Sequence, residues 1–262
     1  MSLQLAHREF GEGPPLVVLH GLFGSARNWS SMARHLGESW RVYALDLRNH
    51  GESPWAEAVD YQTMAADVLA FLDEKGIERA AVLGHSMGGK TAMTLALTQA
   101  ERVGPLVVVD IAPVQYTHSM LPYVEAMTAL ELADLGRRAE ADARLEPHVP
   151  ERGIRAFLLQ NLVQRDGVFA WQLNLAALGA GMETISGFPR EVMERNYAGS
   201  TLFLGGAQSD YIRPEHHGEI YRLFPQAEFE DIPGAGHWVH AEAPESFLAH
   251  VRDFLARGGS EG

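Results

Sequence analysis

The sequence predicts an α/β fold with a mostly parallel central sheet, and three observations support this prediction. Short apolar runs alternate with longer segments of helical period along most of the 262-residue chain. Several of these runs are apolar throughout, which is typical of strands that helices cover on both faces. The chain also contains 26 glycines, as expected for a fold with many tight turns between strands and helices.

The expected strands are spread along the whole chain. An edge strand is expected at residues 3–10 and a last strand at residues 227–232, and the clearest candidates between them are residues 16–19, 42–45, 80–83, 106–109 and 201–204. The spacing of the apolar residues from Tyr61 to Leu72 predicts a helix that ends at Lys75-Gly76. Further helices are expected at residues 87–99 and 243–256.

One long segment breaks this alternation. No strand is expected between residues 114 and 185, where only helical patterns occur, for example at residues 123–135 and 154–162. We interpret this segment as a helical cap that is inserted into the core. Residues 1–113 and 186–262 then form the core, and residues 114–185 form the cap.

The composition excludes several classes of site and partner. The chain has no cysteine, which excludes disulfides, thiolate metal sites and cysteine nucleophiles. The formal net charge is -13 and no basic patch stands out, which argues against a nucleic-acid partner. No apolar run approaches the roughly 20 residues of a membrane span, and the N-terminus lacks the apolar stretch of a secretory signal. We therefore expect a cytoplasmic protein, and we expect it to be a monomer or a small homo-oligomer.

The strongest motif is G-H-S-M-G at residues 84–88, which matches the pattern G-x-S-x-G. It follows the apolar run at residues 80–83 and opens the helix expected from Met87. A sharp strand-to-helix turn of this kind presents a serine at the tip of a strand, with glycines where a Cβ would collide with neighbouring backbone. The motif therefore predicts that Ser86 is a nucleophile.

Two backbone amides are expected to stabilise the oxyanion that forms when a serine attacks a carbonyl. The motif H-G-L-F-G at residues 20–24 follows the strand expected at residues 16–19 and places an amide opposite the nucleophile. Leu22 is the expected donor, with Phe23 as the alternative, and Met87 supplies the second amide. His20 is expected to orient this loop.

His237 is the expected general base. It lies in G-A-G-H-W at residues 234–238, a glycine-rich loop after the last expected strand, and it follows Ser86 in the chain. An imidazole with a pKa near neutrality is suited to accept the serine proton and return it to the leaving group.

Two aspartates qualify as the acid that orients His237. Asp210 follows the strand expected at residues 201–204, which is the commoner position in folds of this kind. Asp110 ends the all-apolar strand at residues 106–109, where a carboxylate needs a partner. The residues alone leave this choice open.

Six segments together resemble the YbfF-type bacterial esterases and their mitochondrial relatives among the abhydrolase-domain proteins, within the α/β-hydrolase superfamily. They are HGLFGS at residues 20–25, DLRNHGES at 46–53, GHSMGGK at 84–90, DIAPV at 110–114, FLLQNL at 157–162 and GHWVHA at 236–241. The resemblance implies a cofactor-free and metal-free esterase or thioesterase of the α/β-hydrolase fold with a small helical cap. It also implies that Asp110 is the acid and that Ser209 is an auxiliary group. The family has no aspartate at the position of Asp210, which stays the alternative.

The sequence thus predicts hydrolysis of small or short-to-medium acyl esters or thioesters through an acyl-serine intermediate. Expected residues of the acyl pocket are Phe23, Trp171, Met182, Tyr211 and Trp238. One alternative is a C–C hydrolase, lyase or lactonase reaction on the same triad. The other is a ligand-binding receptor with low turnover.

Overall fold

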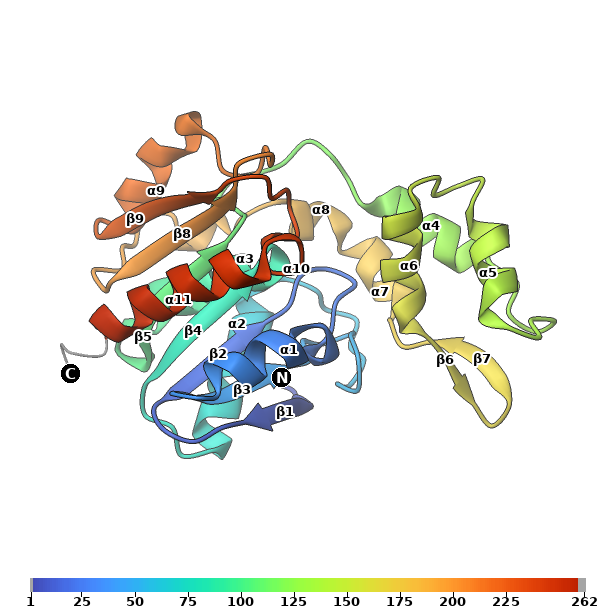
Figure 1. Ribbon diagram of the computed structural model, residues 1–262, viewed down its shortest axis with the longest axis horizontal. Helices are drawn as coiled ribbons and strands as arrows, with labels where there is room; N and C mark the ends of the chain where they lie inside the picture. The colour runs from blue at the N-terminus through green and yellow to red at the C-terminus, as the bar shows by residue number, and fades with distance from the viewer. Residues whose placement is uncertain (1, 259–262) are drawn as a thin grey trace.

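The computed structural model describes residues 2–258, so residues 1 and 259–262 of the predicted core lie outside the described part. A seven-stranded sheet runs through the centre of the fold (Figure 1). Its order is β1-β3-β2-β4-β5-β8-β9, and all neighbours are parallel except β1 and β3. The strands are β1 His7–Phe10, β2 Pro15–Leu19, β3 Arg41–Leu45, β4 Ala80–His85, β5 Val103–Val109, β8 Thr201–Gly206 and β9 Ala227–Ile232. This topology confirms the predicted fold class.

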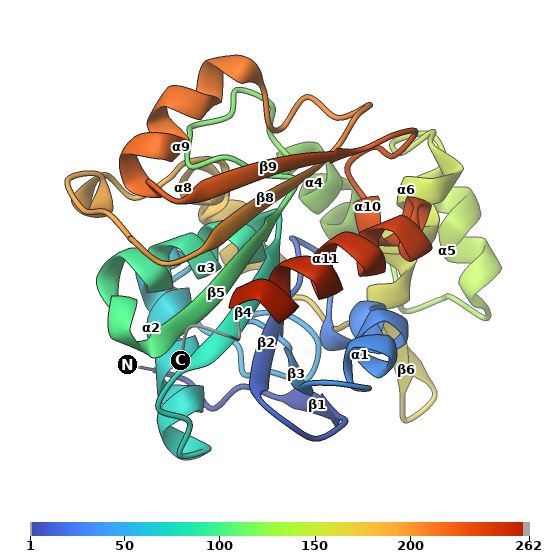
Figure 2. The ribbon, with the colours of Figure 1, turned by 60° about the vertical axis from the view of Figure 1, so that its left-hand side comes forward.

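Successive strand residues point to opposite faces of the sheet, so the apolar strands present apolar side chains on both faces. Helices cover each of these faces. Leu16 and Val18 pack in one hydrophobic cluster with residues of α1 (Ser30–Leu36) and α11 (Pro244–Gly258). Val17 and Leu19 pack in the other cluster, against the helices of the opposite face. Those helices are α2 (Tyr61–Glu74), α3 (Met87–Thr98) and α9 (His217–Leu223). Figure 2 shows α11 crossing the sheet on the face opposite to α2 and α3.

The parallel strands bring the predicted site residues to one edge of the sheet. In the strand register, Leu19 of β2 pairs with Gly84 of β4, and Val109 of β5 pairs with both His85 of β4 and Leu204 of β8. The loops after β2, β4, β5 and β8 therefore leave the sheet side by side. Crevices at the carboxyl ends of such strands are the usual ligand sites of open α/β sheets.

The segment between β5 and β8 forms a separate group of elements beyond this edge (Figure 1). Its helices are α4 (Leu121–Ala129), α5 (Arg138–Leu145), α6 (Arg152–Leu158), α7 (Leu175–Ala180) and α8 (Met182–Ser186). It also contains a hairpin of β6 (Leu162–Arg165) and β7 (Val168–Trp171), which the helical interpretation of this segment did not include. The turn between these strands is Asp166-Gly167, and both residues have positive φ, of 50° and 83°. An Asp-Gly pair of this kind is a strong hairpin signal.

Lys90 joins the two ends of this segment to α3. Its ammonium group donates hydrogen bonds to the carbonyl oxygens of Val114 at 2.9 Å, Ser186 at 3.0 Å and Gly187 at 2.6 Å. Val114 lies where the chain leaves the core, and the other two lie where it returns. Burial lowers the pKa of Lys90 to about 7.

The described residues contain no helix that is both long and apolar enough to span a membrane.

Candidate active site

Ser86 occupies a strained turn between β4 and α3. Its backbone has φ 53° and ψ -118°, a conformation that residues other than glycine rarely adopt. The Ser86 amide donates to the carbonyl of Val109 on the neighbouring strand at 3.0 Å, which ties the turn to the sheet. A Cβ at Gly84 would lie 2.2 Å from the carbonyl oxygen of Gly88, so the turn closes only with glycine there. The local geometry is that of the predicted strand-to-helix elbow.

The loop after β2 lies directly against this turn. A Cβ on Gly21 would lie 3.2 Å from the Cβ of Ser86 and 2.9 Å from Nδ1 of His85. The Phe23 amide donates to Nε2 of His50 at 3.2 Å. The amides of Leu22 and Met87, in contrast, have no hydrogen-bond partner within residues 2–258. Of the two alternatives for the first oxyanion donor, Leu22 is therefore the one whose amide is free.

Two neutral histidines hold this loop against the loop after β3. Burial lowers the pKa of His20 to about 4 and that of His50 to about 3. Nδ1 of His20 lies 2.8 Å from the carbonyl oxygen of Gly21, and Nε2 of His20 accepts from the Leu47 amide at 2.9 Å. His20 thus contacts both the 20–24 loop and the loop after β3.

His237 contacts Asp110. Nδ1 of the imidazole lies 2.7 Å from Oδ2 of the carboxylate, and the Asp110 side chain is 1% exposed. Ser209 donates its hydroxyl to the same oxygen at 2.5 Å, and the Gly206 amide donates to Oδ1 at 3.1 Å. These bonds satisfy a carboxylate that ends an apolar strand and fix it toward the imidazole.

Asp210 lies in a different environment. It is exposed and lines a second, polar hollow that Ser209 and His237 also border. The described residues show no hydrogen bond between Asp210 and His237. The structure therefore brings Asp110, Ser209 and His237 together, and it leaves Asp210 outside this group.

The loop that carries His237 is fixed from several sides. Nε2 of His85 donates to the carbonyl of His237 at 2.9 Å, and burial lowers the pKa of His85 well below its usual value, so His85 is neutral. The Glu242 carboxylate accepts from the amides of Gly236 at 2.7 Å and Trp238 at 3.2 Å, on either side of His237. Sequence reasoning did not identify Glu242.

Tyr211 lies against the imidazole of His237. The two rings stack with their centroids 4.0 Å apart and an interplanar angle of 21°. The Tyr211 hydroxyl is 2.7 Å from Nε2 of His118.

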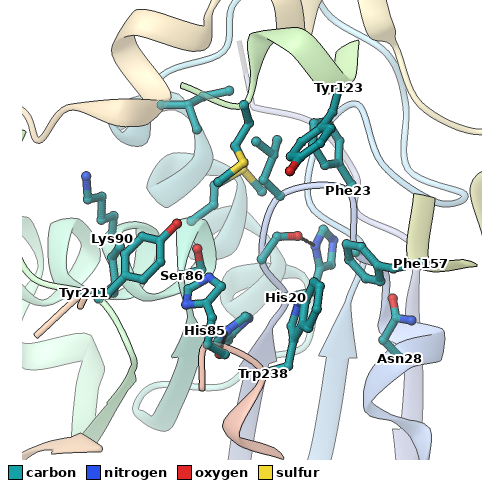
Figure 3. Close-up of a pocket in the computed structure, with 18 of the residues that line it drawn as sticks. His20, Phe23, Asn28, His85, Ser86, Lys90, Tyr123, Phe157, Tyr211 and Trp238 are labelled. Atoms are coloured by element: carbon teal, nitrogen blue, oxygen red, sulfur yellow. Dashed lines mark hydrogen bonds between the residues drawn. The ribbon is translucent and has the colours of Figure 1, made fainter. Parts of the chain in front are cut away.

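Ser86 and His237 face one cavity of about 390 Å³ (Figure 3). Figure 3 shows Ser86 between Tyr211 on one side and Phe157 on the other. No hydrogen bond joins the Ser86 hydroxyl to His237 in the described chain, and such bonds often tighten only when substrate is bound. The cavity volume falls in the usual range of small-molecule sites, about 300–1,000 Å³.

Four of the five expected pocket residues line this cavity, namely Phe23, Met182, Tyr211 and Trp238. Trp171 was predicted to line it and does not. It lies on β7, and its indole N–H donates to the carbonyl of Met127 at 3.0 Å, which holds the side chain against α4. Ile154, Phe157 and Leu158 were not among the expected pocket residues, and they line the cavity from one face of α6. Their i, i+3, i+4 spacing was the available signal.

Comparison with known proteins adds independent evidence for the fold and the family of the chain. The profile of the alpha/beta hydrolase fold family matches residues 14–244. The chain is 44% identical over 251 residues to sn-1-specific diacylglycerol lipase ABHD11 of Mus musculus, covering 93% of this chain and 81% of that protein. It is 36% identical over 244 residues to Esterase YbfF of Escherichia coli (strain K12), covering 92% of both chains. A solved structure described as a marine microorganism esterase superposes with a TM-score of 0.93 at 35% identity, covering 97% of this chain and 100% of that one.

Proposed function

Because the chain belongs to the alpha/beta hydrolase fold family, we propose that it hydrolyses carboxylic esters with Ser86 as the nucleophile and His237 as the general base. The observation that carries this proposal is the arrangement at the carboxyl edge of the sheet. There a strained serine and a carboxylate-bound histidine line the same cavity. The names of the two relatives, an esterase and a lipase, support ester hydrolysis as the reaction.

In the proposed mechanism, Nε2 of His237 accepts the hydroxyl proton of Ser86 as Oγ attacks the ester carbonyl. The tetrahedral oxyanion accepts hydrogen bonds from the amides of Leu22 and Met87. The N-terminus of α3, a helix of 12 residues, adds its positive dipole end at this point. The intermediate collapses to an acyl-serine as His237 returns the proton to the departing alcohol. Water then attacks the acyl group by the same steps in reverse and releases the acid.

Asp110 is proposed to be the acid of this triad. Its carboxylate accepts from Nδ1 of His237, so Nε2 is the nitrogen that is free to accept the Ser86 proton. The same contact favours the imidazolium that forms during attack. Ser209 is proposed as an auxiliary group, because its bond to Oδ2 fixes the carboxylate from the side of the 206–211 loop.

The walls of the cavity support an uncharged acyl chain as the bound part of the substrate. Lys90 is the one lysine or arginine among the described residues that line it, and its three protons are all donated to backbone carbonyls. An anionic chain would therefore enter the cavity without a charged partner, which costs free energy. Apolar side chains from α4, α6 and α8 lie over Ser86, and we propose that residues 114–185 act as a cap.

The test is steady-state hydrolysis of p-nitrophenyl esters from acetate to dodecanoate by the wild-type protein and by Ser86→Ala. The proposal predicts saturable turnover of uncharged esters, with a preferred chain length, and loss of at least about 10³-fold in kcat in the variant. Equal rates in both proteins would contradict it. A wild-type protein without turnover that binds a small ligand tightly would favour the receptor alternative instead.

A further inference from the structure

Phe23 has a backbone conformation that is unusual for a bulky residue. Its φ is 62°, in the left-handed region that favours glycine and asparagine. The amide of Gly24 donates to the carbonyl of Gly21 at 2.9 Å, so residues 21–24 form a β-turn with Phe23 at the third position. A positive φ at that position is the mark of a type II turn, where glycine is strongly preferred. A phenylalanine there persists only where its surroundings determine the conformation.

Two hydrogen bonds hold the backbone of Phe23 in this conformation. Its amide donates to Nε2 of His50 at 3.2 Å, and its carbonyl accepts from Nδ2 of Asn161 at 2.8 Å. Nδ1 of His50 lies 2.9 Å from the carbonyl of Arg48, which leaves Nε2 as the acceptor. The peptide groups on both sides of Phe23 are therefore fixed, one from the core and one from the segment at 114–185.

The same turn positions the amide of Leu22. The Gly21 carbonyl is directed toward Nδ1 of His20 at 2.8 Å and the Gly24 amide at 2.9 Å. Because the N–H and C=O of a trans peptide point in opposite directions, this holds the Leu22 amide facing away from those two groups. If φ of Phe23 relaxed to a negative value, the turn would convert from type II to type I and the peptide between Leu22 and Phe23 would flip. The flip would turn the Phe23 amide away from Nε2 of His50, so the turn would lose its hydrogen bond to the loop after β3. The 21–24 loop would then no longer hold the Leu22 amide at a fixed position beside Ser86.

Asn161 is well placed to prevent that change. It is the last residue of the short helix Leu159–Asn161, between α6 and β6, and its side chain is buried, with 4% exposure. Nδ2 makes a second bond to the carbonyl of Leu158 at 3.2 Å, and the backbone carbonyl accepts from the Gln172 amide at 2.8 Å. The position of the Asn161 amide group thus depends on the fold of the 114–185 segment itself.

We propose that Asn161 is a positioning residue of the oxyanion hole, through which the 114–185 segment holds the Phe23 turn and so directs the Leu22 amide toward Ser86. This inference rests on the proposed function. It means that the segment completes the catalytic machinery in addition to covering the acyl pocket. Catalysis then requires the segment to be docked on the core even for substrates too small to touch it.

The test compares Asn161→Leu, which is nearly isosteric and lacks the donor, with the milder Asn161→Ala. Removing one oxyanion donor typically costs about 10²–10³ in kcat, so a donor that is misplaced part of the time should cost about 10- to 100-fold. KM should change by less than about threefold, because the oxyanion exists only in the transition state. The affinity of an alkyl trifluoromethyl ketone, which forms a tetrahedral adduct with the serine, should fall in parallel with kcat.

The matched control is Gln160→Ala. Gln160 also bridges to the core, through a hydrogen bond from Asn28 at 2.5 Å, but its side chain makes no hydrogen bond to residues 21–24 within the described chain. Its loss should change kcat by less than about threefold. Thermal unfolding of each variant separates a loss of fold from a loss of positioning.

A double-mutant cycle gives the decisive readout. Glycine adopts positive φ freely, so the kcat penalty of Asn161→Leu should shrink at least about fivefold in a Phe23→Gly background. An unchanged kcat in folded Asn161→Leu and Asn161→Ala would overturn the proposal, and so would an equal penalty in both backgrounds. A wild-type protein without Ser86-dependent turnover would instead refute the proposed function.

Discussion

The assignment of Asp110 as the triad acid gives the sharpest single-residue prediction. In Asp110→Asn, an amide must replace a carboxylate that accepts three hydrogen bonds, from His237 and Ser209 at Oδ2 and from Gly206 at Oδ1. If the amide nitrogen takes the position of Oδ2, it faces Nδ1 of His237 as a donor and selects the tautomer with hydrogen on Nε2. That tautomer cannot accept the serine proton. If the nitrogen takes the position of Oδ1, it faces the Gly206 amide, and two donors oppose each other in a buried site.

Either orientation is therefore unfavourable, and the expected loss in kcat is about 10³- to 10⁴-fold, as for the equivalent change in serine proteases. This corresponds to about 4–5.5 kcal/mol of transition-state stabilisation. The matched control is Asp210→Asn, which alters an exposed carboxylate and should change kcat by less than about threefold. Initial rates with p-nitrophenyl butyrate at neutral pH measure both. A larger loss in Asp210→Asn than in Asp110→Asn would refute the reasoning from the geometry.

Three further predictions follow from individual contacts. Gly21→Ala places a methyl group 2.9 Å from Nδ1 of His85 and 3.2 Å from the Ser86 Cβ, so kcat should fall at least about 100-fold in a protein that still folds. Wild-type kinetics in this variant would contradict the prediction, because they would show that the loop can move away from Ser86. Met182→Trp narrows the cavity that Met182 lines and should lower kcat/KM for decanoate far more than for acetate. Trp171→Phe should leave the chain-length profile unchanged, because Trp171 lies outside the cavity. A chain-length shift in Trp171→Phe alone would contradict this assignment of the pocket residues. Burial lowers the pKa of Lys90 to about 7 in the folded protein, from a value near 10.5 in the unfolded chain. Between these two pH values the unfolded state binds one more proton than the folded state. The free energy of unfolding should therefore rise with pH in this range, by up to about 1.4 kcal/mol per pH unit. Urea titrations at pH 7 to 9 should therefore show that the free energy of unfolding rises more steeply with pH for the wild type than for Lys90→Met. Parallel slopes would contradict this role of Lys90.

The sheet was predictable because its strands are short apolar runs with clear boundaries. The last strand, Ala227–Ile232, has the predicted limits, and the others differ by a few residues at their ends. The first strand begins at His7, not at residue 3. Residues before it form other contacts, such as the bond from the Leu3 amide to Asp67 at 2.7 Å.

The hairpin within the 114–185 segment shows where sequence reasoning failed. Its strands have four residues each, too few to establish a period of two against the surrounding helical pattern. The Asp166-Gly167 pair was the stronger signal, because both residues adopt positive φ. Trp171 was expected to line the pocket, but the direction of its side chain depends on its place on β7.

Motifs predict the catalytic residues of the site, but the contacts that hold these residues in three dimensions are not visible in the sequence. The order of Ser86 and His237 and the flanking glycines predict a catalytic role for both residues. Choosing between Asp110 and Asp210 needs the position of the imidazole relative to each loop, which depends on long-range packing. The contact between Asn161 and Phe23 joins residues 138 positions apart, and no local pattern predicts it.

The most direct test of the central claim is covalent labelling of the nucleophile. A fluorophosphonate that reacts with activated serines should add one equivalent to the native protein, and peptide mass spectrometry should place the label on Ser86. Labelling should be abolished in Ser86→Ala and slowed at least about 100-fold in His237→Ala, which lacks the base that activates the hydroxyl. Label on another residue, or equally fast labelling of folded Ser86→Ala, would contradict the assignment of Ser86 as the nucleophile.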